Sequence, residues 1–281
     1  MNHDDFGDRM KSYEKHETSR HFLSTLPVIA RIDGRKFSKF TKPFKKPFDT
    51  RISDAMRTTT QRLVDHTNAC IGYCQSDEIT LIFHNSHIGG EIFFNGKIHK
   101  LTSVLASLST AYFIRALDCE LSADIGVETD GRILSMIGNV VPHFDARVWQ
   151  VPSQTEAANA LLWRCMDAQK NGISAACRSM YSAKAMHGKS QSDMIVMMMD
   201  NNVDYYREYE QSDRVGSFFQ RKTYEVKLSD DVWEAIPEHQ RRPENRVVTR
   251  SRVENLLLGP FKQYVNREAI IFNGATARTN W

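Results

Sequence analysis

The alternation of apolar and polar residues predicts a buried strand near the start of the chain and a pair of strands after it. An apolar run at 28–32, entered through Pro27, predicts the first strand. Two further runs, at 70–73 and 79–83, predict strands that meet at a turn over 75–77. These three segments form the first part of a predicted sheet.

Apolar positions at helical spacing predict three long helices. The first covers 49–68 and opens on an aspartate, a residue type suited to capping a helix N-terminus. The second contains the apolar positions between 98 and 112. The third begins at Ser153, where Glu156 completes the spacing of a capping box, and extends to about residue 180.

Weaker patterns complete the prediction. They indicate a short strand at 92–94, a strand at 146–151, a helix that starts at Ser190 or Ser192 and holds the methionines of 194–199, and a strand at 218–228. The segment 230–281 is predicted to be irregular, with a strand-like stretch at 269–272.

The order strand, helix, strand, strand, helix, strand, helix is that of a split βαβ sheet, the α+β architecture of polymerase palms and nucleotide cyclases. We expect an antiparallel-containing sheet with helices on one face. The sequence predicts a palm-like domain over 1–182 and a C-terminal extension over 183–281. The same architecture also occurs in proteins without catalysis, so function must come from particular residues.

Composition limits the classes of protein that need to be considered. The chain has 281 residues, of which 41% are hydrophobic and 25% charged, and its formal net charge is +3, so it should fold without a global basic field. Five cysteines without a Cys-x-x-Cys pair predict free thiols, not a disulfide framework or a zinc site. The polar N-terminus and the lack of an apolar run of about 20 residues predict a cytoplasmic protein without a membrane segment.

Two segments concentrate positive charge. The stretch Arg35 to Lys46 contains six cations and no acid, and a second basic stretch runs from Arg241 to Arg252. Such segments are either solvated faces or contacts for nucleic acid or triphosphate, and the sequence leaves both interpretations open.

The candidate chemistry lies in two strand-end carboxylates. Asp33 closes the first strand and precedes Gly34, while Asp77 lies in the turn between the next two strands, after Ser76. On a split βαβ sheet these acids can converge and hold divalent metal, with Glu78 as a possible third carboxylate. The alternative is that Asp33 forms a salt bridge and that Asp77 caps its turn.

The chain resembles the tRNA-His guanylyltransferase superfamily, closest to the bacterial guanylyltransferase-like branch. The resemblance covers about 27–180 and rests on motifs that recur there in the same order: Arg31-Ile-Asp-Gly-Arg35, Phe37, Phe40, Lys46-Pro47, Tyr73-Cys-Gln-Ser-Asp-Glu78, Phe144-Asp-Ala-Arg147 with Pro152-Ser153, and Trp163-Arg164 followed by Asp167. It implies a palm-fold nucleotidyltransferase that adds nucleotides to the 5′ end of tRNA in the 3′-to-5′ direction, after ATP activates the 5′-phosphate.

The resemblance also implies the residues of the site. Asp33 and Asp77 would be the catalytic ligands of two Mg²⁺ ions, assisted by Gly34. The nucleotides, ATP and GTP or other NTPs, would lie near Arg31, Gly34, Arg35, Lys36, Phe37, Lys46, Ser76, Lys97 and Lys100. Assembly as a homotetramer is implied as well.

One departure from the family pattern bears on the substrate. Enzymes that add the extra G to tRNA-His carry His-Ile-Asn-Asn where this chain has Gln169-Lys-Asn-Gly172. The chain resembles instead the branch that repairs truncated tRNA 5′ ends against the opposite strand. The alternatives are nontemplated guanylyltransfer to tRNA-His, a catalytically weak tRNA-binding palm protein, and a cyclase-like enzyme that acts on free nucleotide.

Overall fold

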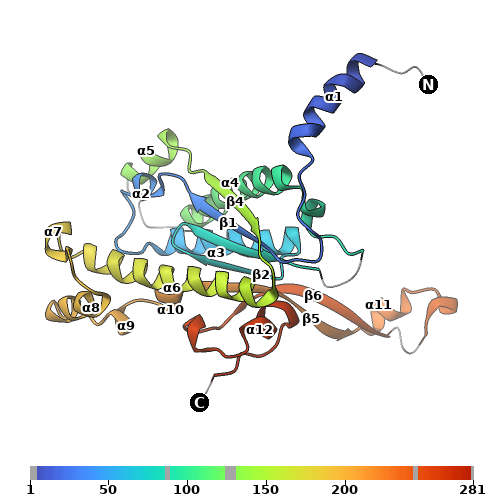
Figure 1. Ribbon diagram of the computed structural model, residues 1–281. Helices are drawn as coiled ribbons and strands as arrows, with labels where there is room; N and C mark the ends of the chain where they lie inside the picture. Colours follow the sequence, from blue (N-terminus) through green and yellow to red (C-terminus); the bar gives the residue numbers. More distant parts are fainter. Residues whose placement is uncertain (1–4, 86–88, 124–130, 243–245, 280–281) are drawn as a thin grey trace.

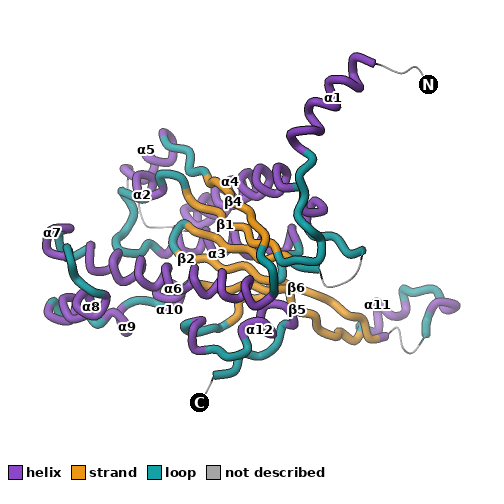
Figure 2. Tube along the Cα trace, viewed as in Figure 1, coloured by secondary structure: helices purple, strands orange, loops and turns teal. Residues whose placement is uncertain are grey.

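The central feature of the computed structural model, which describes residues 5–85, 89–123, 131–242 and 246–279, is an antiparallel sheet (Figures 1 and 2). The order of its six described strands is β4-β1-β3-β2-β5-β6. Their bounds are β1 (Val28–Gly34), β2 (Ile71–Gln75), β3 (Glu78–Phe83), β4 (Phe144–Gln150), β5 (Ser217–Lys227) and β6 (Val247–Leu256).

The first three strands form the predicted split βαβ unit. Both β1 and β2 pair antiparallel with β3, so they run parallel to each other on its two sides. The helix α3 (Thr50–Thr67) connects them. The α+β, palm-like class predicted from the sequence is therefore confirmed.

Helices cover both faces of the sheet, whereas the sequence analysis expected them on one face. The helices α3 and α4 (Ile98–Ala123) pack on the face that receives Ala30 and Ile32 of β1. The helix α6 (Gln154–Arg178) packs on the opposite face with α12 (Arg267–Asn273), against Ile29 (Figure 1). The prediction was wrong because a continuous apolar run, unlike an alternating one, is typical of a strand buried on both faces.

Local capping signals set the starts of the helices as predicted. The Asp49 carboxylate accepts a hydrogen bond from the Arg51 amide at 3.1 Å, and Ser153 Oγ accepts one from the Glu156 amide at 3.1 Å. Ser190 forms a reciprocal capping box with Asp193 at the start of α8 (Gln191–Asp200). Capping residues therefore located these helix starts correctly.

Three predictions in the weaker segments were wrong. The stretch 92–94 leads into a 3₁₀ turn, η1 (Phe93–Gly96), and 269–272 lies in the helix α12. The supposedly irregular 230–281 segment contains β6, which pairs with β5 along its whole length. Its solvent-facing side chains are mostly polar, so β6 lacks the apolar alternation that indicates a strand.

Shorter elements surround this framework. They are α1 (Asp5–Thr18), α2 (Phe37–Phe40), α5 (Gly131–Asn139), α7 (Ala183–Met186), α9 (Tyr205–Glu208), α10 (Gln211–Val215), α11 (Asp230–Glu234), η2 (Glu238–Gln240) and η4 (Phe261–Gln263). The helix α1 stands away from the rest and buries none of its residues (Figure 1). All five cysteines are free thiols, and none of the described helices combines the length and hydropathy needed to traverse a bilayer.

The cap of α3 predicts a stability that depends on pH. Burial alone would raise the pKa of Asp49, but hydrogen bonds from the Arg51 side chain and the Lys45 amide outweigh it and lower the pKa. Because the folded-state pKa is depressed, the contribution is complete above the ordinary value of about 3.9 and is lost as the pH falls further. We expect Asp49→Asn to reduce the free energy of unfolding at pH 6 by about 1–2 kcal/mol.

Urea unfolding at pH 6 and at pH 3 measures this effect, and the difference between wild type and Asp49→Asn should shrink at the lower pH. Asp118→Asn, at an exposed position on α4, serves as the control and should change little at either pH. A wild-type advantage that grew on acidification would contradict the assignment.

Candidate active site

The end of β1 and the β2–β3 turn touch each other. The Gly34 amide donates a hydrogen bond to the Asp77 carbonyl oxygen at 3.0 Å. A Cβ atom added to Gly34 would lie 2.9 Å from the Asp77 Cβ and 2.6 Å from Cδ2 of Phe37. A glycine is therefore required here, because any side chain would push the two segments apart.

The turn at 75–77, which the sequence predicted, makes the adjacent acids Asp77 and Glu78 point in different directions. Ser76 has a left-handed backbone with φ 55°, and its hydroxyl donates to Asp77 Oδ1 at 3.1 Å. Asp77 lies against Gly34, whereas Glu78 is already the first residue of β3 and pairs across the sheet with Asp33. Asp77 and Glu78 thus have different surroundings despite being adjacent in the sequence.

Asp33 and Asp77 are close enough to interact electrostatically. Burial raises the pKa of Asp77, and the negative charge of Asp33 raises it further. Two half-buried carboxylates that repel each other are stabilised by a cation between them. The pair therefore has the charge and the ligand type that a hard divalent metal requires.

An ion-pair network surrounds this carboxylate pair on the α6 side of the sheet. Arg31 lies 3.2 Å from Asp33 Oδ2 and 2.9 Å from Glu78 Oε2. Arg164 of α6 holds Glu78 with two hydrogen bonds of 2.6 Å and Asp167 with one of 3.0 Å. The Arg164 side chain is only 5% exposed, and although burial would lower its pKa, Glu78 and Asp167 raise it.

This network surrounds Glu78, the possible third carboxylate, with ion-pair partners. Both of its oxygens face guanidinium groups. Among the described residues, no cluster of three or more His, Cys, Asp and Glu side chains has a metal-holding arrangement. The set of donors is therefore the two aspartates and nearby backbone carbonyls, which fits Mg²⁺ because this ion usually takes one or two carboxylates and completes its shell with phosphates and water.

The carboxylates open into a cavity of about 770 Å³. Three segments form its walls: the strand ends with Asp33 and Asp77, the basic segment 41–49, and one side of α6. Lys46 lies in the second wall, where its Nζ donates to the Thr41 carbonyl at 2.8 Å. Burial lowers the pKa of Lys46, and the neighbouring Asp49 partly opposes this.

The α6 wall includes residues to which the sequence analysis gave no role. Asn171, Ser174 and Arg178 continue along the helix from Arg164 and Asp167 and line the far part of the cavity. Their spacing of three and four residues was a usable signal, because it places polar side chains on one side of a helix whose other side is apolar.

Several of the residues predicted to bind nucleotide meet at this cavity. Arg31, Phe37, Lys46 and Ser76 line it. Phe37 is only 4% exposed, and its ring centroid lies 5.2 Å from that of Phe113, so it is also part of the aromatic core. Arg35 and Lys36 are exposed and follow Gly34 directly, outside the cavity lining.

Lys97 and Lys100 lie at the opposite end of the sheet, and the structure does not bring them to the cavity. Lys97 is paired with His21, and the adjacent Gly96 accepts a hydrogen bond from Phe22, just before the start of β1. Phe113 of α4 packs beside the site, and thirteen residues of helix at about 1.5 Å each separate it from Lys100 by about 20 Å. Within one chain, this distance argues against Lys97 or Lys100 contacting a triphosphate bound in the cavity.

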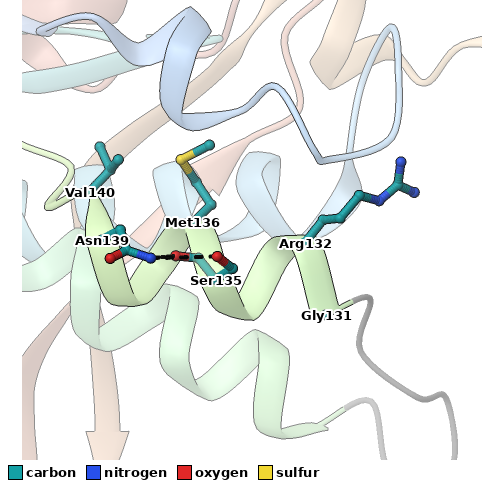
Figure 3. A pocket seen from close by; sticks show the side chains of 6 residues that line it. All are labelled: Gly131, Arg132, Ser135, Met136, Asn139 and Val140. Carbon is teal, nitrogen blue, oxygen red and sulfur yellow. Dashed lines mark hydrogen bonds between the residues drawn. The ribbon is translucent and has the colours of Figure 1, made fainter.

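A second pocket, of about 370 Å³, runs along α5 and differs in chemistry (Figure 3). Met136 and Val140 supply apolar surface, and the Asn139 amide is bonded to Ser135 (Figure 3). Among the described residues, none of those that line it carries a carboxylate. The larger cavity is therefore the better candidate for an active site.

Comparison with known proteins finds a matching family model and relatives with similar sequences. The family model of tRNAHis guanylyltransferase matches residues 7–152. An uncharacterised protein of Acanthamoeba polyphaga mimivirus is 31% identical over 227 residues, which is 72% of this chain and 74% of that protein. The tRNA(His) guanylyltransferase of Schizosaccharomyces pombe is 27% identical over 59% of this chain and 58% of its own length. The chain spans less than two thirds of the curated guanylyltransferases that it matches.

Solved structures agree with the sequence comparison. A bacterial tRNA(His) guanylyltransferase-like protein in complex with ATP superposes with a TM-score of 0.66 and 30% identity, covering 76% of this chain and 88% of its own. The Saccharomyces cerevisiae tRNA(His) guanylyltransferase gives a TM-score of 0.60 at 22% identity, over 73% of this chain and 90% of its own, a likeness of fold alone.

The ion-pair network predicts a large cost for removing Arg164. Arg164→Leu would leave Glu78 with Arg31 as its remaining partner, and breaking a buried pair costs about 3–5 kcal/mol. Urea unfolding of the two single variants Arg164→Leu and Glu78→Gln and of the double variant should give a coupling energy above about 1 kcal/mol.

Arg147→Leu is the matched control. Arg147 pairs with Asp145 on the neighbouring strand β4, but its side chain is 60% exposed, so its loss should cost less than about 1 kcal/mol. Equal costs for the two arginines would show that the network does not support the site.

Proposed function

The chain belongs to the tRNAHis guanylyltransferase family of nucleotidyltransferases, and we propose that it is a magnesium-dependent enzyme that adds nucleotides to the 5′ end of tRNA in the 3′-to-5′ direction. The observation that carries this proposal is the contact between the Asp33–Gly34 end of β1 and the Asp77 turn, at the mouth of a cavity with basic walls. A carboxylate pair that can hold metal ions, next to basic side chains, suits a reaction in which both substrates carry phosphates.

Asp33 and Asp77 would hold the metal, and the Gly34 carbonyl is a further candidate donor. When bound, magnesium lowers the pKa of an attacking hydroxyl and offsets the charge of a triphosphate. Arg31 keeps the Asp33 carboxylate in position through its contact at 3.2 Å, and Ser76 does the same for Asp77 at 3.1 Å. These contacts fix the two ligands before any substrate arrives.

The cations of the cavity divide into two groups. Arg31 and Arg164 are already engaged by carboxylates, so they orient the site. Lys45 and Lys46 lie on the wall formed by the basic segment, and Arg178 lies at the far end of α6, where these cations can bind phosphate groups. In the proposed reaction the tRNA 5′-phosphate attacks the α-phosphorus of ATP, which forms an adenylylated 5′ end and releases pyrophosphate. The 3′-hydroxyl of an incoming nucleotide then attacks the activated 5′-phosphorus and displaces AMP.

The segment Gln169–Gly172 favours templated repair over guanylyltransfer to tRNA-His. Gly172 is buried, and a Cβ atom at this position would lie 2.9 Å from the Tyr205 hydroxyl and 3.3 Å from the Asp213 carbonyl oxygen. The second asparagine of the His-Ile-Asn-Asn element would therefore have to move the Tyr205 hydroxyl and press on the Asp213 carbonyl. The structures of bacterial guanylyltransferase-like proteins, one with ATP and one with GTP, are 30% and 26% identical to the chain, which supports the same branch.

The remaining expectations stay predictions: assembly as a homotetramer, a cytoplasmic location and a domain boundary near residue 182. Nontemplated guanylyltransfer is the second candidate, since the family model carries that activity in its name. A weak tRNA-binding palm protein is less favoured because binding alone would not need the paired aspartates. A cyclase is less favoured because it would act on free nucleotide without RNA, whereas the matching family is named for an enzyme that acts on tRNA.

The metal assignment predicts the behaviour of three aspartate variants. Asp33→Asn and Asp77→Asn should each lower nucleotide addition at least about 100-fold, because each removes a metal ligand. Both should also weaken Mn²⁺ binding, measured by electron paramagnetic resonance. Asp145→Asn is the control: Asp145 faces Asp33 across the strand pair but does not line the cavity, so its loss should change neither measurement much.

Near-normal Mn²⁺ binding by a folded Asp33→Asn or Asp77→Asn variant would remove these residues from the metal site. Circular dichroism of each variant establishes that it is folded, which keeps a loss of structure apart from a loss of ligand.

Template use is tested with tRNAs that lack the first 5′ nucleotide and carry each of the four bases opposite the gap. With ATP and Mg²⁺ present, we expect the incorporated nucleotide to follow Watson–Crick pairing for all four bases. Addition of G to full-length tRNA-His whatever base stands opposite would establish the second candidate instead. A cyclic product formed from free nucleotide without RNA would establish a cyclase.

A further inference from the structure

An exposed tryptophan stands on α6 directly before the arginine of the ion-pair network. Trp163 is 54% exposed, and the Arg164 guanidinium lies over its ring at 4.5 Å from the ring centroid. Neighbouring residues of the same helix, Leu161 and Cys165, are fully buried and anchor α6 to the sheet. The packing of α6 therefore does not account for a large aromatic ring at this position.

The network holds the indole in place. Arg164 donates hydrogen bonds to both oxygens of Glu78, and Glu78 pairs across the sheet with Asp33. One face of the ring thus rests on a fixed cation, and the exposed area falls on the remaining surface. Through Arg164, Glu78 and Arg31, a series of contacts connects the indole to Asp33, one of the two proposed metal ligands.

Trp163 lies at the rim of the cavity, at the end where the carboxylates are. Residues four apart on a helix are neighbours on its surface, so Trp163 lies next to Asp167. Asp167 lines the cavity, whereas Trp163 itself does not. A group stacked on the indole would therefore sit just outside the cavity while its attached phosphate could reach Asp33 and Asp77.

The chemistry of this ring suits a nucleobase. An aromatic side chain offers a π-face to any base, and an arginine beneath it adds a cation–π contribution. The end of a base-paired stem presents one open base face of this kind, next to its 5′-phosphate. An incoming nucleotide triphosphate is a second source of a base, but its phosphates would be drawn to Lys45 and Lys46 inside the cavity, away from the rim.

We propose that Trp163 is a stacking platform for the terminal base of the RNA acceptor stem and thereby positions the 5′ end over the carboxylate pair. This inference rests on the proposed function and adds to it a residue that binds the RNA substrate by shape, without reading its sequence.

A direct binding measurement tests the platform without requiring turnover. The probe is an acceptor-stem hairpin whose 5′-terminal base is 2-aminopurine, the fluorescence of which falls further when an aromatic ring covers its open face. Wild-type protein should quench this probe. Trp163→Ala should lose the quenching and weaken binding about 5- to 100-fold, the usual effect of removing one aromatic–base stack. Trp163→Phe should retain most of both.

Two controls isolate the effect. Met166→Ala truncates another exposed apolar side chain of α6, on a side of the helix that does not line the cavity, and should leave quenching and affinity unchanged. A hairpin with 2-aminopurine several base pairs from the end should not respond to any of the proteins.

Unchanged quenching and affinity in Trp163→Ala would overturn the proposal. A raised KM for nucleotide with an unchanged affinity for the hairpin would assign the stacked base to the free nucleotide and would also overturn it. A changed mass in size-exclusion chromatography with unchanged quenching would make Trp163 a contact between copies of the chain. If wild type quenched the probe but added no nucleotide, the proposed function would fail while the platform stood.

Discussion

The repulsion between two carboxylates is the constraint on which the site depends. Folding brings Asp33 and Asp77 together at the end of β1, where burial raises the pKa of Asp77 and the charge of Asp33 raises it further. Glu78 and Asp167 add two more acids, while Arg31 and Arg164 supply two guanidiniums. Among these six side chains, four carboxylates face two guanidiniums, which leaves an excess of two negative charges. A fold that stores such an excess is more stable with divalent cations bound, since a ligand that binds the folded state alone stabilises it.

The C-terminal third stabilises β2, the strand before the Asp77 turn, through two hydrogen bonds and one close glycine contact. The Tyr73 hydroxyl donates to the Val215 carbonyl at 3.0 Å, and Gln75 Nε2 donates to the Asp213 carbonyl at 3.1 Å. Gly216, with φ 83°, lets the chain pass the Tyr73 ring, because a Cβ there would lie 2.4 Å from that ring. The strand β2, which leads into the Asp77 turn, is thus held to α10 through two side chains, in addition to its backbone pairing with β3 and β5. The backbone of the turn gains rigidity from residues more than 130 positions away in the sequence.

The sequence predicted what local patterns determine. The apolar runs of β1, β2 and β3, the cap at Asp49 and the turn before Glu78 are local signals, and each was found near its predicted position. The covering of both sheet faces was missed although the continuous apolar run of β1 indicated it, and which helix packs on which face is not set by any local pattern. The short run at Ile270 and Ile271 was read as a strand, since periodicity cannot separate a short buried strand from a short buried helix. Lys97 and Lys100 were carried over from motifs, whereas the length of α4 determines their distance from the site.

The helix α6 connects the core to the cavity because its two sides have different functions. Its small and apolar residues, such as Ala157 and Leu161, pack on the sheet, and its polar residues line the cavity. Gly172 lies where the two sides meet, and its missing side chain lets Tyr205 and the Asp213 backbone approach the helix. A side chain at 172 would push against Tyr205 and press on the carbonyl of Asp213, the α10 group to which Gln75 donates. The departure from His-Ile-Asn-Asn is therefore not an isolated surface change: it is coupled through α10 to the turn that carries Asp77. Choice of RNA substrate and support of the carboxylate pair would then be linked by the packing of one glycine.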